Sequence, residues 1–200
     1  MSLHPSLSIV LVGLCYILGF GALSYVRRQG ASLQFAVEGL VVTAAGAAVD
    51  LIGVPLHPLL FLVALYLITM RVRLMVDLGN AFARRKQHRR ALGLYRIALR
   101  LWPDAASRQI VLINRGVTEL GMQEPERAFV TLGEALSGEK QRAGAKYLAA
   151  GYYNLGLACR RTGRKAQAIR RFNEAIDAYP HSVYGRAAQR ALKEGEPKEG

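Results

Sequence analysis

Long apolar stretches dominate the first 70 residues. Residues 7–25 contain no charged side chain, and a run of this length is close to the roughly 20 residues that a helix needs to cross a bilayer. The next apolar run, residues 35–70, would be about 54 Å long as one helix, nearly twice the hydrocarbon thickness. It must therefore break, and its two prolines within residues 53–58 are where a helix is disfavoured. The pattern predicts a transmembrane domain over residues 1–73, with spans at 6–26, 33–53 and 57–73.

Charged residues are scarce before residue 71 and frequent after it. The four that precede residue 71 have charges that cancel: Arg27, Arg28, Glu38 and Asp50. The whole net charge of +13 therefore lies in the later part of the chain. A charge of this sign suits an anionic partner, whether lipid, nucleic acid or an acidic protein, and does not choose among them.

The positions of the arginines predict the topology. Cytoplasmic flanks of spans carry an excess of Lys and Arg. With three spans, the loop of Arg27 and Arg28 and the flank of Arg71 and Arg73 fall on one side, whereas two spans would separate them. A cleaved signal peptide is disfavoured because no basic residue precedes the first run. We expect an integral protein of the bacterial inner (plasma) membrane, with its N-terminus outside and its C-terminal domain in the cytoplasm.

Two acidic residues within the apolar part and the two cysteines of the chain are candidates for a functional role. Ionisable groups within a membrane are functional candidates, but Glu38 lies near the arginine loop and Asp50 near the proline break. We therefore expect both carboxylates to reach headgroup water. Cys15 and Cys159 lie far apart without a C-x-x-C spacing. We expect them to be buried small hydrophobic residues, with no disulfide and no metal site.

A repeat begins near residue 72. Three glycines, Gly79, Gly116 and Gly156, are each followed by an alanine 12 residues later and by another alanine seven residues after that. Small residues at fixed spacing are typical of antiparallel helices that approach closely. The spacing predicts an all-α array over residues 74–193, with helix pairs at 72–105, 109–142 and 149–182 and a cap helix at 182–193. We expect residues 194–200 to form a disordered tail.

The repeat resembles the tetratricopeptide repeat family. The first unit carries its pattern at Met75, Leu78, Gly79, Phe82, Ala91, Tyr95, Ala98 and Pro103. The third unit carries it at Tyr152, Leu155, Gly156, Cys159, Ala168, Phe172, Ala175 and Pro180. The middle unit is degenerate, because Arg115 and Glu119 occupy apolar positions. The resemblance implies an α-solenoid of about three helix pairs whose first helices line a groove for a peptide segment or helix of a partner protein.

The junction between the two parts contains neither Gly nor Pro from Leu59 to Leu78. We therefore expect the third span to continue as one helix into the first repeat, ending near Arg85. If this helix stands along the membrane normal, the array is upright, and the antiparallel helix that follows brings Trp102 back to the headgroups. The amphipathic ring of Trp is favoured there. The predicted membrane-interface residues are Arg27, Arg28, Arg71, Arg73 and Trp102.

Two groups of residues are candidates for partner binding. The first group forms two basic turns on one edge of the array, with the acidic turn 123–126 between them: Arg84, Arg85, Lys86, Arg89, Arg90, Arg160, Arg161, Arg164 and Lys165. These turns suit an acidic protein or nucleic acid, or they are solvated connections. The second group is Asn80, Asn114 and Asn154, whose amides can grip a peptide backbone or merely solvate the helices.

The resemblance also suggests a particular ligand, but the residues of this chain match the family's binding site for it only in part. Asn80 and Asn114 match asparagines of the family's carboxylate clamp for chaperone C-terminal tails. The clamp's cations do not carry over, because Val76, Ala150 and Asn154 stand at their positions. We expect a different peptide.

Catalysis is not predicted. The four histidines are scattered over termini and turns, no carboxylate pair shares a helix face in an apolar pocket, and the sequence contains no nucleophile elbow or phosphate loop. We expect no cofactor. The predicted function is a membrane-tethered adaptor or scaffold that binds proteins at the cytoplasmic face, in recruitment or in assembly of a membrane complex. The alternatives are a constitutive subunit of a membrane complex and, less favoured, a membrane-anchored nucleic-acid binder, because no aromatics interleave with the arginines.

Overall fold

The fold was analysed in a computed structural model that describes residues 5–26, 32–138 and 143–195. These residues contain ten α-helices and no strand, so the all-α prediction is confirmed. The chain divides into two compact units, unit 1 (Met1–Arg71) and unit 2 (Val72–Gly200).

Unit 1 contains three helices, α1 (Pro5–Val26), α2 (Leu33–Leu51) and α3 (Pro58–Thr69). Glycines allow these helices to pack closely. A Cβ atom on Gly39 would lie 2.8 Å from the Ile17 side chain, and one on Gly46 would lie 2.6 Å from the Phe61 ring. The small interior that results is built around Ile9, Tyr16, Phe61 and Leu65.

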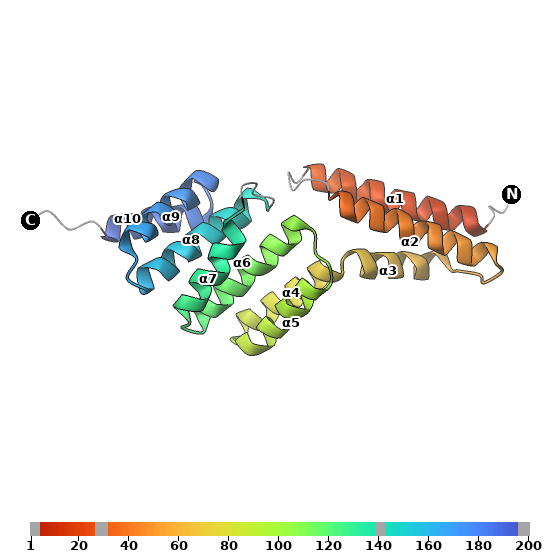
Figure 1. Ribbon diagram of the computed structural model, residues 1–200. Coiled ribbons are helices and arrows are strands. Elements are labelled where there is room, and N and C mark those ends of the chain that lie inside the picture. The colour runs from red at the N-terminus through yellow and green to blue at the C-terminus, as the bar shows by residue number, and fades with distance from the viewer. Residues whose placement is uncertain (1–4, 27–31, 139–142, 196–200) are drawn as a thin grey trace, which may run out of the picture. The chain divides into compact units, whose positions relative to one another are not determined.

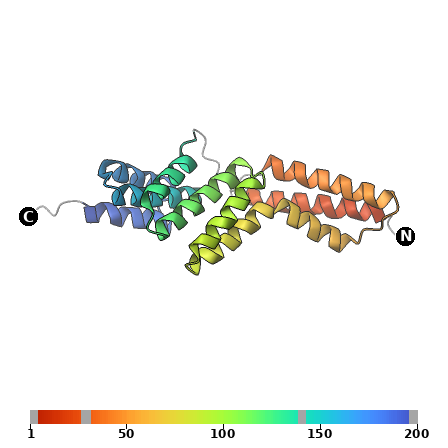
Figure 2. The ribbon, with the colours of Figure 1, turned by 60° about the horizontal axis from the view of Figure 1, so that its bottom comes forward.

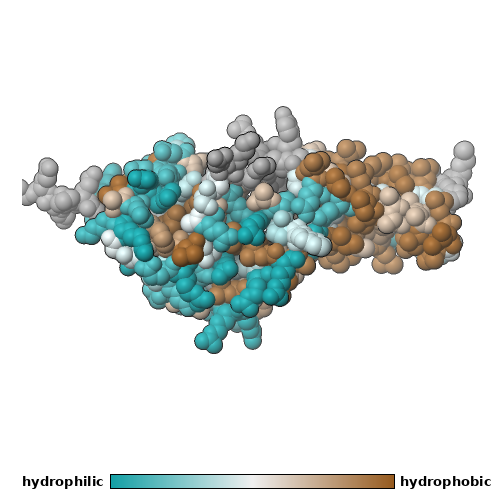
Figure 3. Space-filling model, in the orientation of Figure 1, coloured by the Kyte–Doolittle hydropathy of each residue, from teal (hydrophilic) through white to brown (hydrophobic). Residues whose placement is uncertain are grey.

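The surface of unit 1 is apolar. Two of its helices are long and apolar enough to cross a membrane, over Ser6–Ser24 and Leu33–Leu51. Hydrophobic residues cover most of the face of unit 1 that is seen in Figure 3. A third span arises only if α3 is counted together with α4 (Arg71–Arg84), since the two helices form a bent pair. The three-span topology therefore stays a prediction.

The expected continuous helix across the junction is wrong. Helix α3 ends at Thr69, and Met70 separates it from α4. The Thr69 hydroxyl donates to the Leu65 carbonyl at 2.7 Å, and such a bond back to the preceding turn tends to bend a helix. The Arg71 guanidinium donates to the Ile68 carbonyl at 2.8 Å. The single continuous helix on which the upright arrangement depended is therefore absent.

Unit 2 is a stack of antiparallel helix pairs followed by a single helix. Figures 1 and 2 show the pairs lying side by side in chain order. After α4, the helices are α5 (His88–Arg100), α6 (Ala105–Gly121), α7 (Pro125–Leu136), α8 (Ala145–Arg161), α9 (Lys165–Ala178) and α10 (Val183–Gly195).

Each helix pair of unit 2 is closed by the same contact. A Cβ atom on Gly79 would lie 2.5 Å from the Tyr95 ring, one on Gly116 2.5 Å from the Leu132 side chain, and one on Gly156 2.6 Å from the Phe172 ring. In each pair the large residue follows the glycine by 16 positions. The repeated alanines are buried as well: Ala91, Ala98, Ala128, Ala135, Ala168 and Ala175. The expectation that these small residues are contact points between helices is confirmed.

The degenerate middle pair contains a polar contact in place of an apolar one. Glu119 is 1% exposed and accepts a hydrogen bond from Arg115 Nε at 2.9 Å. Buried charge is tolerated when it is paired, and Arg115 pairs with one oxygen of the buried carboxylate, while Glu119 Oε2 has no hydrogen-bond partner among the described residues. Gln109 bridges the end of this pair to the next one, donating to the Ala135 carbonyl at 2.9 Å and accepting from the Ala143 amide at 2.8 Å.

The two cysteines differ in environment. Cys159 is fully buried in unit 2, and burial raises the pKa of its thiol, so it remains protonated and acts as a small hydrophobic residue. Cys15 is exposed on α1, so the expectation that it is buried is wrong. Because the exterior of unit 1 is itself apolar, a small hydrophobic residue can lie on the outer side of α1.

Candidate partner-binding surfaces

The three connections that join the helices within each pair share one backbone geometry. Lys86, Gln123 and Gly163 each adopt a positive φ, of 60°, 62° and 78°. The amide that follows each of them donates to the carbonyl five residues before it, at distances of 3.0, 3.1 and 2.8 Å. This is a helix C-terminal motif in which a left-handed residue reverses the chain.

Contacts between these turns place them along one edge of unit 2. Arg164 pairs with Glu126 at 3.1 Å, and Arg161 donates to the Leu120 carbonyl at 3.3 Å. The His88 ring packs against Gly121, at 3.1 Å from the position of a Cβ atom there. The order of the turns along this edge is therefore basic, acidic and basic.

The cations of the last turn are largely engaged within the protein. The Arg164 guanidinium lies 4.3 Å from the Phe129 ring centroid in addition to pairing with Glu126. Arg160 lies 5.8 Å from the centroid of the Phe172 ring. Lys165 is exposed. Much of the charge predicted to bind a partner at this turn therefore contributes to packing between neighbouring pairs.

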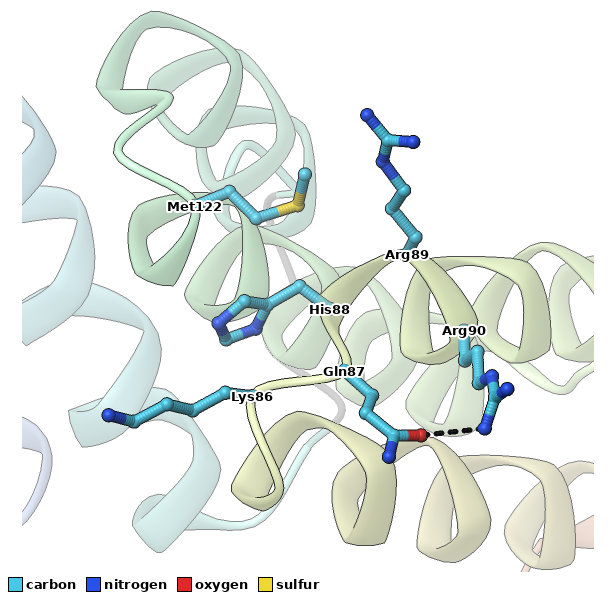
Figure 4. A pocket seen from close by; sticks show the side chains of 6 residues that line it. All are labelled: Lys86, Gln87, His88, Arg89, Arg90 and Met122. Carbon is cyan, nitrogen blue, oxygen red and sulfur yellow. Dashed lines mark hydrogen bonds between the residues drawn. The ribbon is translucent and has the colours of Figure 1, made fainter.

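The cations of the first turn surround an open pocket of about 500 Å³ lined by Lys86, Gln87, His88, Arg89, Arg90 and Met122. Figure 4 shows Lys86 and Arg89 extending to different sides of the pocket, with the His88 ring beside Met122. Arg90 donates to the Gln87 amide oxygen at 2.9 Å. Arg84 ends α4, Arg85 begins the turn, and both are exposed.

The three candidate asparagines all make hydrogen bonds inside unit 2. Asn80 accepts from the Tyr95 hydroxyl at 2.7 Å. Asn114 donates to the Ile110 carbonyl at 2.8 Å, and Asn154 donates to the Ala150 carbonyl at 2.7 Å. Asn154 is 8% exposed. An amide offers two donors and an acceptor oxygen, so one bond does not exhaust it, and partner binding by these residues stays a prediction.

A charge pair within unit 1 was missed by sequence reasoning. The Arg71 guanidinium holds both carboxylate oxygens of Glu38, at 2.5 and 2.8 Å, and Gln34 donates to the same carboxylate at 2.8 Å. The side chains of Arg71 and Glu38 are 25% and 26% exposed. Glu38 is therefore bound by a cation 33 positions away instead of by headgroup water alone. The sequence contained a hint of this pair, since Glu38 and Arg71 are two of the few charged residues near the apolar helices and have opposite charges.

The other predicted interface residues show less organisation. Arg27 and Arg28 lie outside the described residues. Arg73 lies 3.9 Å from Asp77 one turn later, and both side chains are exposed. Trp102 is 85% exposed and has a φ of 48°, which is an uncommon backbone region for a bulky residue. Their contact with a membrane stays a prediction.

In the described part of the chain, no group of three or more His, Cys, Asp or Glu side chains could hold a metal ion.

Stacked helix pairs with a repeated small-to-large contact define unit 2 as an α-helical repeat domain. Residues 107–181 match the sequence profile of the tetratricopeptide repeat. This part of the chain is thus similar to the tetratricopeptide repeat family, and a domain of this kind indicates a protein–protein interaction adaptor. The matched residues cover the second and third pairs, and the first pair repeats their glycine contact.

Two solved structures have a similar fold. One is the TPR2AB domain of yeast Sti1 in a complex with pHSP90, with a TM-score of 0.51 and 24% identity over 62% of this chain and 48% of that one. The other is the Sgt2 TPR domain from Aspergillus fumigatus, with a TM-score of 0.50 and 23% identity over 65% of this chain and 87% of that one. This chain thus spans about half the length of the Sti1 chain. A search of curated protein sequences finds no match.

Proposed function

We propose that the protein is a membrane-tethered adaptor: unit 1 anchors it, and the tetratricopeptide array of unit 2 binds a peptide segment or helix of a partner protein at the cytoplasmic face. The observation that carries the proposal is the presence, in one chain, of helices long and apolar enough to cross a membrane and a tetratricopeptide array. Recruitment of clients or assembly of a membrane complex is the role that this combination serves.

Exposed apolar residues on the first helices of the pairs support a peptide-binding face. Leu78 on α4 is 48% exposed and Val117 on α6 is 37% exposed. Asn80 and Asn114 lie on the same two helices. Val117 lies one turn from Asn114 on α6, and an apolar side chain beside an amide can bind a peptide through both its side chains and its backbone.

The partner is a peptide other than a chaperone tail. The similar Sti1 structure is a complex with pHSP90, but a carboxylate clamp requires cations on the first helices. Val76 and Ala150 stand at two of those positions and are buried, at 7% and 8% exposure. A clamp for a C-terminal carboxylate therefore has no support on this face.

The competing proposal is a constitutive subunit of a membrane complex. In that case glycines and carboxylates of unit 1 would pack against a neighbour. Gly39, Gly46 and Glu38 are already used inside unit 1, which favours the adaptor.

Purification of the full chain in mild detergent, followed by mass spectrometry, tests the proposal. We expect substoichiometric protein clients that are lost in the double variant Leu78→Lys and Val117→Lys. The matched control places lysine at Val130 and Ile169, which are 66% and 54% exposed on second helices. Clients that the control loses equally would contradict binding at the first helices. Stoichiometric membrane partners retained by both variants would favour the constitutive subunit.

A further inference from the structure

The first helix pair of unit 2 carries a run of positive charge that no carboxylate interrupts. Between Asp77 and Asp104 the sequence contains seven cations and no carboxylate. All seven are exposed, and they form the basic face of the first pair: Arg84, Arg85, Lys86, Arg89, Arg90, Arg96 and Arg100. By contrast, residues 105–136 contain three arginines and four glutamates, and each arginine there forms an ion pair. Figure 3 shows hydrophilic side chains gathered where the α4–α5 pair ends in its turn.

The positive charges of the basic face repel one another and the N-terminus of α5 when no anion is bound. Arg89 and Arg90 occupy the first turn of α5, and the side chain of its N-cap residue Gln87 makes no capping bond. A helix N-terminus favours negative charge, so cations there oppose the helix dipole. The equivalent turn of α7 has Glu126 in that place. An anionic partner would relieve the repulsion at α5 that no carboxylate of the pair relieves.

The face also carries apolar groups in the arrangement that suits a bilayer surface. Arg89, Arg96 and Arg100 are spaced seven and four residues apart, which places them in one stripe along α5. Ile97 beside this stripe is 46% exposed, and Trp102 just beyond α5 is 85% exposed. Basic side chains accompanied by Trp and an aliphatic residue are typical of helices that lie in the headgroup region.

Chain length keeps this face near any membrane that holds unit 1. Helix α4 begins at Arg71, the last residue of unit 1, and has 14 residues. The basic turn therefore lies no more than about 20 Å along α4 from the end of unit 1. Tethering of this kind raises the effective concentration of lipid for a weak surface site.

We propose that the basic face of the first pair binds the headgroup phosphates of anionic phospholipids in the membrane that anchors the chain. The pocket between Lys86, Arg89 and Met122 accommodates one such phosphate, and the stripe along α5 contacts others. The inference rests on the tether of the proposed function, but it concerns a different surface from the peptide-binding face. It also replaces the upright arrangement, because the turn and Trp102 then contact the same lipid surface.

A single tryptophan moved to the turn tests the inference in the full chain. The variant combines Gln87→Trp with Trp102→Phe and is reconstituted in nanodiscs of phosphatidylcholine, with or without 30 mol% phosphatidylglycerol (about a third of the lipid, enough for a clearly negative surface). Both lipid mixtures carry brominated acyl chains that quench tryptophan near the bilayer. We expect quenching in the anionic nanodiscs only, and its loss at high salt.

Charge variants identify the surface. Each basic residue near an anionic membrane contributes about fivefold to binding, so Arg96→Gln with Arg100→Gln should weaken docking about 30-fold. The matched control, Arg186→Gln with Arg190→Gln, removes two exposed arginines at the same spacing on α10 and should leave quenching unchanged. Circular dichroism checks that both variants remain folded. Equal effects of the two pairs would overturn the assignment to the first pair.

The remaining outcomes separate the inference from the tether. If alkaline carbonate leaves the protein in membranes but residue 87 is quenched equally with and without phosphatidylglycerol, the lipid inference is wrong and the tether stands. If carbonate extracts the protein, the tether is wrong, and binding of the extracted chain to the same two lipid mixtures as vesicles decides the lipid inference alone. Binding to RNA or polyglutamate without any dependence on phosphatidylglycerol would assign the face to a macromolecular anion and overturn the proposal.

Discussion

The close approach between Gly156 and Phe172 gives the sharpest test of the fold. A Cβ atom on Gly156 would lie 2.6 and 2.7 Å from two ring carbons of Phe172. The ring has little freedom to move, because the tilted Tyr153 ring has its centroid 5.9 Å from that of Phe172 and the Arg160 guanidinium lies 5.8 Å from the same centroid. Gly156→Ala must therefore force the two helices apart.

Two opposing contributions set the size of the effect. Replacing a helix-interior glycine by alanine stabilises a helix by about 1 kcal/mol, whereas overpacking a core costs about 1–3 kcal/mol or more. We expect Gly156→Ala to lower the free energy of unfolding by about 2 kcal/mol net. Gly133→Ala is the control, because a Cβ atom there meets nothing within 4 Å, and it should stabilise unit 2 by up to about 1 kcal/mol.

Thermal unfolding followed by circular dichroism in detergent measures the difference. For a domain of this size, about 3 kcal/mol between the two variants corresponds to a gap of roughly 12 °C in Tm. If both variants raised Tm by the same amount, helix propensity alone would determine the outcome. The repeated glycine contact would then not be what closes the pairs.

Three further predictions concern single side chains. Glu38→Ala should destabilise unit 1 by about 1–3 kcal/mol, because Arg71 loses its charged hydrogen-bond partner, while Arg71→Lys should retain part of that stability. Unfolding in denaturing detergent compares the two variants, and equal losses of stability would contradict a bidentate contact between Arg71 and Glu38. Gln109→Ala removes one bond within the middle pair and one to the segment that leads into α8, so it should lower the free energy of unfolding by about 2 kcal/mol, and an unchanged urea midpoint would refute this. Burial raises the pKa of Tyr95, so the folded state holds the phenol proton more tightly, and stability should fall as the pH rises above about 10. Tyr95→Phe should reduce that alkaline loss, and an identical pH profile would show that Tyr95 is not its source.

The repeated spacing of small residues was enough to predict the array, because one contact recurs in each pair. A glycine that faces a large residue 16 positions later leaves the same signal three times, and the alanines share its helix faces. The middle pair was harder to interpret, since Arg115 and Glu119 break the apolar pattern. Their mutual bond is a local compensation that a pattern of single positions does not show.

The junction and the charge contacts could not be predicted from the sequence. The sequence has neither Gly nor Pro at this point, yet α3 ends at Thr69, where a hydroxyl and a guanidinium group bond carbonyls of its last turn. The pairing of Glu38 with Arg71 depends on helix packing across 33 positions. The arginines of the turns also looked equivalent in the sequence. Only contacts such as that of Arg164 with Phe129 separate the cations that hold pairs together from those that surround the pocket.

The turns at Lys86, Gln123 and Gly163 are held by main-chain hydrogen bonds of the same pattern. Their side chains are therefore not required for the reversal of the chain, and three different residues serve equally well. Selection can change these positions one turn at a time while the buried glycine contacts stay as they are. The array can thus acquire a new charge pattern on this edge, and with it new partners, without a new fold.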